Sequence, residues 1–85
     1  MHTLTVTVGS AVGLHARPAA IIAEAAGELG SEVTIGLVGG NAVDASSSLL
    51  IMTLGAGKGA VVEVSGEDQA AVEKIAALVT QDLDA

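Results

Sequence analysis

The sequence predicts an α+β sandwich in which helices cover one face of an antiparallel sheet. In several short segments apolar residues alternate with polar ones, which is the period of strands with one buried face. Other segments repeat apolar residues at helical spacing, so each helix has a single apolar stripe. Strands with one solvated face are typical of antiparallel pairing, and the helices must cover the other face. The predicted order is strand, helix, strand, strand, helix, strand, helix, without a linker or an internal repeat.

Length and composition restrict what such a fold can bind. The 85 residues suffice for one domain, residues 1–85. No residue is aromatic, so the core must be aliphatic and stacking on bases or sugars is excluded. A formal net charge of −7 repels nucleic acid and anionic membranes, and we expect neither as a partner. The absence of cysteine fits a reducing compartment, so we expect a cytoplasmic protein, and we expect it to be a monomer.

The first strand and the first helix are separated by a glycine-containing loop. Threonines alternate with the apolar residues of the strand, Leu4, Val6 and Val8. The helix is expected from Ala16 to about Gly27, with Gly27 or Gly30 ending it. Its inward face is predicted to consist of Ala19, Ile22, Ala23 and Ala26.

A hairpin and a short helix follow. The alternating residues Val33, Ile35 and Leu37 predict a strand, which the turn Gly39-Gly40-Asn41 joins to a short strand through Ala42 and Val43. Three serines then precede a short apolar run, and serine is a favoured N-cap residue. We therefore predict a short helix that Gly55 closes.

The last strand and the last helix complete the pattern. The strand is predicted from the alternation of Ala60, Val62 and Val64. The helix is expected from about Asp68, with acidic residues at its favourable N-terminal end. Its apolar face is predicted to be Val72, Ile75, Ala76, Val79 and Leu83.

The six residues from Gly13 to Pro18 predict a phosphate-binding site at the start of the first helix. A helix N-terminus has unpaired N–H donors and a partial positive charge, so it attracts anions. With His15 as the N-cap, the amides of Ala16 and Arg17 point outward beside the imidazole, and the Arg17 guanidinium adds a planar pair of donors. Pro18 falls in the first turn, where its fixed φ and missing N–H suit a helix start.

His15 is the candidate nucleophile of this site. Much of a free imidazole is uncharged near neutral pH, so strong activation is not needed. A lone histidine at such a junction is usually only a polar cap, and a nearby arginine usually only solvates the helix end. The whole hexapeptide favours the phosphate site over that interpretation. Gly13 permits an unusual backbone conformation or close approach by a partner, and Leu14 is expected to anchor the loop in the core.

Metal and cofactor chemistry are not expected. His2 and His15 are the only histidines, and no carboxylate pair repeats at ligand spacing. His2 is interpreted as a solvated residue at the start of the first strand.

The chain resembles HPr, the histidine-containing phosphocarrier family of the bacterial phosphoenolpyruvate-dependent sugar phosphotransferase system. The segment from Gly13 to Ala19 matches the active-site signature of that family at its usual distance from the N-terminus. The serine-led short helix, the Leu54-Gly55 pair and the Gly57-Lys58-Gly59 stretch extend the resemblance to essentially the whole chain. It implies an open-faced β-sandwich with strand order 1-4-2-3 and three helices on one face.

The resemblance also implies a function. His15 would accept a phosphoryl group on Nδ1 from phosphorylated enzyme I and pass it to enzyme IIA domains, which feed sugar uptake. Arg17 and the amides of Ala16 and Arg17 would stabilise the phosphate while one side of it stays open to the partner. Such a chain is a carrier with a phosphohistidine intermediate, not an enzyme with independent turnover.

Ser47 corresponds to the regulatory serine of the family when the chains are aligned on Leu54-Gly55. The resemblance therefore implies phosphorylation of Ser47 by a dedicated ATP-dependent HPr kinase/phosphorylase. Ser46 or Ser47 can also simply cap the short helix, and one role does not exclude the other. A phosphate at Ser47 would hinder the docking of enzyme I through its added charge.

Apolar residues of the short helix surround the histidine site in this family. We expect Leu50 and Leu54 to pack in the core, and Ser48, Leu49 and Met52 to contact partners.

Two other functions remain open at this stage. A regulatory paralogue, serving a nitrogen-related or dihydroxyacetone kinase branch, would carry the same phosphohistidine and transfer it poorly to sugar-specific domains. A plain α+β ligand-binding module, with His15 as a mere cap, would not be phosphorylated at all.

Overall fold

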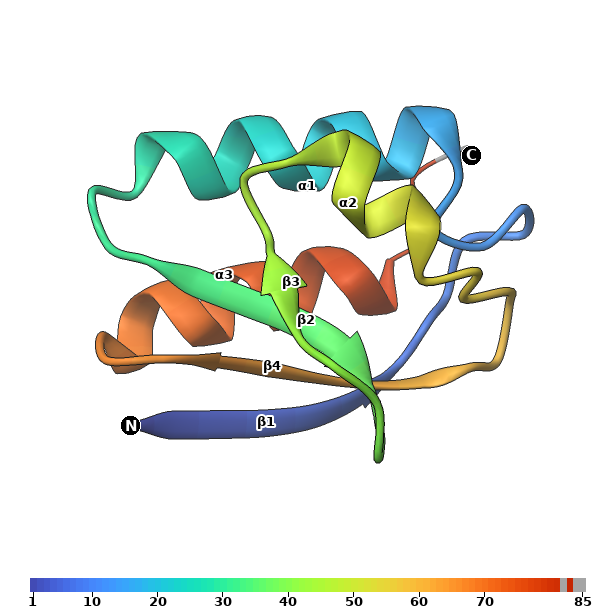
Figure 1. Cartoon of the computed structure of the whole chain (residues 1–85). Coiled ribbons are helices and arrows are strands. Elements are labelled where there is room, and N and C mark those ends of the chain that lie inside the picture. The colour runs from blue at the N-terminus through green and yellow to red at the C-terminus, as the bar shows by residue number, and fades with distance from the viewer. Residues whose placement is uncertain (82, 84–85) are drawn as a thin grey trace.

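The computed structural model describes residues 1–81 and 83. It contains the seven predicted elements in the predicted order (Figure 1). They are β1 (His2–Thr7), α1 (Ala16–Glu28), β2 (Val33–Leu37), β3 (Val43–Asp44), α2 (Ser48–Thr53), β4 (Val61–Gly66) and α3 (Gln69–Thr80).

The four strands form one antiparallel sheet in the order β1-β4-β2-β3. Figure 1 shows the three helices on one side of this sheet, which leaves its other face open. The central strand β4 pairs with both β1 and β2, so the side chains of Val62 and Val64 are fully buried beneath the helices. The predicted fold class and strand order are therefore confirmed.

The core is aliphatic, as a chain without aromatic residues requires. Each helix contributes a fully buried isoleucine, and β2 contributes a fourth at the sheet surface: Ile22, Ile51, Ile75 and Ile35. The predicted inward face of α1 is confirmed, because all four of its members are buried. Leu4 of β1 stays 39% exposed, since β1 lies at the margin of the sheet.

A glycine with positive φ follows the end of α1, and hydrogen bonds to a buried serine hold the residues that follow α3. Of the two glycines expected to end α1, Gly30 follows the cap residue Leu29 and adopts a φ of 71°, which only glycine adopts readily. Leu83 was expected on the face of the last helix, but α3 stops at Thr80. The buried Ser10 hydroxyl donates to the carbonyl of Gln81 and accepts from the amide of Leu83, so Leu83 reaches the core from beyond the helix.

One prediction about the short helix is wrong. Leu50 was expected in the core, but it is 42% exposed, and Ile51 takes the inward position. The reason is the register set by the cap: with Ser47 as N-cap, the face directed inward carries Ile51 and the partly buried Leu54. Leu54 packs against the core, in line with its prediction.

None of the helices in the described part of the chain is long and apolar enough to cross a membrane.

Candidate functional site

His15 is the N-cap residue of α1, as the sequence predicted. Its backbone is extended, with φ −94° and ψ −164°, and its carbonyl accepts the first helical bond from the amide of Ala19 at 2.8 Å. The imidazole is exposed and makes no capping bond to the helix. The helix start therefore fixes the backbone of His15, while both ring nitrogens remain free of a capping bond at the surface.

The first turn of α1 offers donors beside this ring. No acceptor within residues 1–81 and 83 binds the amides of Ala16 and Arg17, so both keep their hydrogen-bonding capacity for a ligand. The Arg17 side chain is exposed, and Pro18 is buried in the position where a proline costs the helix nothing. The first turn of α1 thus presents two backbone donors without acceptors and an exposed guanidinium at a helix N-terminus, an arrangement that attracts anions.

The loop before His15 is anchored to the segment that follows α2. Gly13 has a φ of 75°, and a Cβ at this residue would lie 2.4 Å from the carbonyl oxygen of Ala56. The amide of Leu14 donates to that same oxygen at 2.8 Å, and the Leu14 side chain is buried. The unusual backbone conformation expected at Gly13 is confirmed by its positive φ, and Leu14 anchors the loop in the core as expected. The residue on the other side of the contact, Ala56, was not foreseen.

A shallow cavity of about 180 Å³ opens beside His15. It is lined by Val12, Leu14, His15, Met52, Gly55, Ala56 and Gly57. Residues from the loop before α1 and from the end of α2 therefore share one surface.

The predicted contact residues differ in exposure. Leu49 is 69% exposed, whereas Ser48 and Met52 are half-buried, and only Met52 reaches the cavity beside His15. The structure adds two exposed apolar residues, Leu50 and Val12, the latter 59% exposed. Val12 could have been suspected from sequence, because an apolar residue between small residues in a loop has no strand or helix to bury it.

Ser47 caps α2. Its Oγ accepts a hydrogen bond from the amide of Leu50 at 3.2 Å, and its backbone is extended as an N-cap requires. Ser46 instead donates from its hydroxyl and its amide to Oδ1 of Asp44, at 2.7 and 2.9 Å. These two bonds, the hydroxyl first, lower the pKa of Asp44 from its ordinary value of 3.8. Of the two serines considered as caps, Ser47 is the one that serves.

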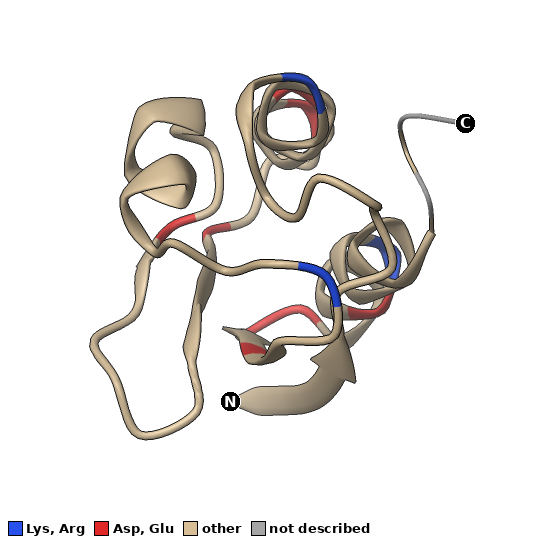
Figure 2. Ribbon diagram, turned by 90° about the vertical axis from the view of Figure 1, so that its right-hand side faces the viewer, with Lys and Arg blue, Asp and Glu red and all other residues tan. Residues whose placement is uncertain are grey.

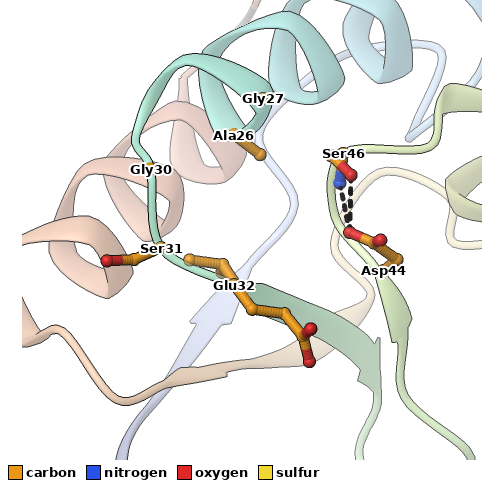
Figure 3. Close-up of a pocket in the computed structure, with 8 residues that line it drawn as sticks. Ala26, Gly27, Gly30, Ser31, Glu32, Asp44 and Ser46 are labelled. Atoms are coloured by element: carbon orange, nitrogen blue, oxygen red, sulfur yellow. Dashed lines mark hydrogen bonds between the residues drawn. The ribbon is translucent and has the colours of Figure 1, made fainter.

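A second cavity of about 280 Å³ lies at the opposite end of α1 (Figure 3). It runs between the C-terminal end of α1, the start of β2 and the turn from Asp44 to Ser46. Glu32 and Asp44 give it acidic walls. Across residues 1–81 and 83, histidines and carboxylates do not gather in groups of three or more that could hold a metal ion.

Charge is unevenly spread around the histidine. Helix α1 contains one basic residue, Arg17, and two acidic residues, Glu24 and Glu28. Figure 2 shows blue and red segments on the helices of the molecule. Arg17 and Glu24 are seven residues apart, so they lie on one exposed side of the helix. Within α1, the positive charge near His15 therefore comes only from Arg17 and from the dipole at the helix start.

Residues 2–81 match the family model of the PTS HPr component phosphorylation site. The chain belongs to the HPr family. The phosphocarrier protein HPr of Streptomyces coelicolor is 42% identical over 82 residues, covering 93% of this chain and 88% of the relative. That of Pseudomonas aeruginosa is 35% identical over 79 residues, with the same coverage of 93% and 88%.

Solved HPr structures share the fold. The crystal structure of a phosphocarrier protein HPr from Bacillus anthracis aligns with a TM-score of 0.85 at 32% identity, covering 92% of this chain and 95% of that one. The crystal structure of HPr-C-His from Thermoanaerobacter tengcongensis gives a TM-score of 0.83 at 32% identity, covering 93% and 91%. HPr proteins are phosphocarriers of the phosphotransferase system rather than catalysts, and this chain is a member of that family.

Proposed function

We propose that this single-domain, cytoplasmic HPr chain carries a phosphoryl group on Nδ1 of His15 between enzyme I and enzyme IIA domains. The observation that carries the proposal is the exposed imidazole at the N-cap of α1, beside two amides without acceptors and the Arg17 side chain. A phosphorylated ring at this point would meet donors on one side and solvent or a partner on the other.

The transfer needs little from the carrier itself. The lone pair of His15 Nδ1 attacks the phosphorus of the donor, a new N–P bond forms, and the bond to the donor breaks with its electron pair staying on the donor. The amides of Ala16 and Arg17 and the guanidinium hold the phosphoryl oxygens during this exchange. Because the site is an open cavity, the same displacement can run onward to the nucleophile of an enzyme IIA domain.

Leu49, Ser48 and Met52 supply the contact surface for these partners in our proposal. Val12 and Leu50 join them, because both are exposed apolar residues of the same loop and helix. Apolar contact at the centre of an interface excludes water from the transferred group.

The test is phosphorylation by enzyme I. The chain is incubated with phosphoenolpyruvate and enzyme I, and its mass is compared before and after mild acid treatment. We expect an acid-labile gain of one phosphoryl group in the wild type and none in His15→Ala. An unmodified wild type with a competent enzyme I would refute the carrier function. Phosphorylation without onward transfer to sugar-specific enzyme IIA would instead indicate a regulatory branch.

We further propose Ser47 as a site of regulatory phosphorylation by an HPr kinase/phosphorylase. Its hydroxyl is partly exposed and lies one residue before the contact helix, so a phosphate there would add negative charge next to Ser48 and Leu49. The test uses ATP and the kinase on wild type, Ser47→Ala and the matched control Ser46→Ala. Loss of modification in Ser46→Ala rather than in Ser47→Ala would assign the site to the neighbouring serine.

A further inference from the structure

One edge of the sheet has unused hydrogen-bonding groups. Val8 donates to Ala60 and accepts from Gly59, each at 2.9 Å, so its backbone faces β4. In an antiparallel pair this direction alternates along the strand, which places the N–H and C=O groups of Thr3, Thr5 and Thr7 on the side away from β4. Within the described residues no backbone group pairs with them.

This edge also lacks the features that usually block edges. Proteins protect edge strands with proline, charged residues, bulges or very short strands. β1 has six residues in unbroken register with β4, and none of them is proline, lysine, arginine or acidic. The opposite edge, β3, has only two residues. Figure 1 shows β1 along the margin of the sheet with no element beyond it.

A groove of about 320 Å³ accompanies the N-terminal half of this edge. It lies between β1 and α3 and is lined by Met1, His2, Thr3, Leu4, Gln69, Val72 and Glu73. Leu4 is 39% exposed and faces the helix side, because its partner Val64 is buried there. A strand added beyond β1 would direct alternate side chains to that same side, toward Leu4 and the groove.

The acidic residues near β1 indicate the charge of the strand that could pair with it. Glu73 lies at the groove, and Glu63, opposite Thr5 in β4, is partly exposed on the open face of the sheet. A second copy of this chain would bring a further net charge of −7 and uncharged threonines. A segment that carries lysine or arginine on its open-face side is favoured instead, since these long side chains extend toward Glu63.

We propose that the β1 edge binds an extended peptide segment of a partner protein by strand addition, with apolar side chains in the β1–α3 groove alternating with basic ones. The backbone groups of Thr3, Thr5 and Thr7 pair with the segment, and Leu4 and Val72 contact its apolar residues. This edge faces away from the N-terminal turn of α1, so a partner can bind there while His15 serves another (Figure 1).

The probe is the peptide acetyl-Lys-Val-Lys-Val-Lys-Val-amide, titrated into the full chain labelled with ¹⁵N and ¹³C and followed by NMR. We expect amide shifts concentrated at Thr3, Thr5 and Thr7 and methyl shifts at Leu4. A peptide N-methylated at alternate residues keeps the side chains and loses donors, and should bind at least about tenfold more weakly. The variant Thr5→Pro lacks one outward N–H, so it should also bind the unmodified peptide at least about tenfold more weakly. Phosphorylation of His15 in this variant should stay at the wild-type rate.

Three outcomes would overturn the proposal. The first is no binding at millimolar peptide, and the second is shifts spread over the acidic surface with equal affinity for the N-methylated peptide. The third is shifts of the three threonine amides with protein concentration alone, which would make a second copy the occupant. Glu63→Gln should reduce the affinity at low salt, and an unchanged affinity would remove the basic character of the segment from the proposal.

Discussion

At the scale of single residues, the histidine site depends on contacts that hold the backbone rather than the imidazole. Gly13 brings the loop against Ala56, Leu14 fastens it by one hydrogen bond and a buried side chain, and Pro18 begins the helix. The imidazole and the guanidinium are left exposed. A site of this kind is sensitive to backbone changes that do not touch the reacting group.

We expect Gly13→Ala to impair phosphorylation. The added Cβ would meet the Ala56 carbonyl at 2.4 Å, and the φ of 75° is unfavourable for alanine, so the loop must move. The matched control is Gly27→Ala, near the far end of α1, whose Cβ would also have no neighbour within 4 Å. The rate of His15 phosphorylation by enzyme I should fall about tenfold or more in the first variant and stay near wild type in the second. Equal rates in the two variants would show that the close contact does not position His15.

Arg17→Ala should slow phosphoryl transfer by about tenfold to a hundredfold, because it removes the charged donor of the site and leaves the helix start intact. Arg17→Lys should recover only part of this loss, since an ammonium group lacks the planar pair of donors. Single-turnover rates from phosphorylated enzyme I measure both variants. A full recovery with lysine would mean that charge alone, without the planar geometry, is what the site uses.

At the scale of elements, α2 shows how a cap decides which residues face a partner. Ser47 sets the register in which Ile51 is buried while Leu49 and Leu50 are exposed. The apolar spacing could not show this, because Leu49, Leu50, Ile51 and Met52 are consecutive and every register places some of them inward. In α1 and α3 the apolar residues recur at helical spacing over about three turns, so only one register buries them all, and most of their buried residues were predicted correctly.

Ser47→Ala should lower the free energy of unfolding by about 1 kcal/mol, the usual contribution of an N-cap serine. Ser47→Asp keeps an acceptor at the cap and should retain most of that stability. Urea unfolding followed by circular dichroism compares the two variants with wild type. The cap role would be contradicted by two equally destabilised variants.

The turn before α2 predicts a pH dependence. The hydroxyl and amide of Ser46 stabilise the charged form of Asp44, so the pKa of this carboxyl lies below 3.8 in the folded chain. A carboxyl whose pKa is lowered by folding stabilises the folded chain at every pH above its ordinary pKa. This stabilisation is lost as the pH falls through the pKa of the folded state. Ser46→Ala should raise the pKa of Asp44 and reduce this loss in acid. A ¹³C titration of the side-chain carboxyl measures the shift, and an unchanged midpoint would contradict it.

At the scale of the whole molecule, one sign of charge dominates. The net charge is −7, and the ion pair between the N-terminal amine and Glu67, at 3.8 Å, is well exposed. Such a pair adds little stability, while repulsion among carboxylates acts over the entire surface. The fold is therefore held together by its aliphatic core against its own charge.

Added salt should consequently stabilise the chain. Raising sodium chloride from about 0.01 M to about 0.5 M shortens the screening length several-fold, which should increase the free energy of unfolding by on the order of 1 kcal/mol. Thermal unfolding at a series of salt concentrations measures the effect, with sodium sulfate separating screening from ion-specific effects. A decrease in stability with salt would mean that attractive pairs outweigh the repulsion.

Sequence alone predicted the elements and their order, because periodicity and caps are local properties. The motif around His15 was predicted for the same reason: the N-cap, the proline and the two amides all belong to one short segment. Ala56 escaped prediction, since its role depends on two loops meeting in space. The open edge of β1 likewise appears only once the strand order is known.

That strand order also bears on how the chain is made. The partners of both β1 and β2 lie in β4, whose residues Val61–Gly66 come late in the sequence. During synthesis the only pairing available to the earlier strands is the short β2–β3 hairpin, so the sheet forms after β4 has left the ribosome. His15 and Ser47 are both synthesised well before that moment, so the complete sheet on which their helices pack forms only when the chain is nearly finished.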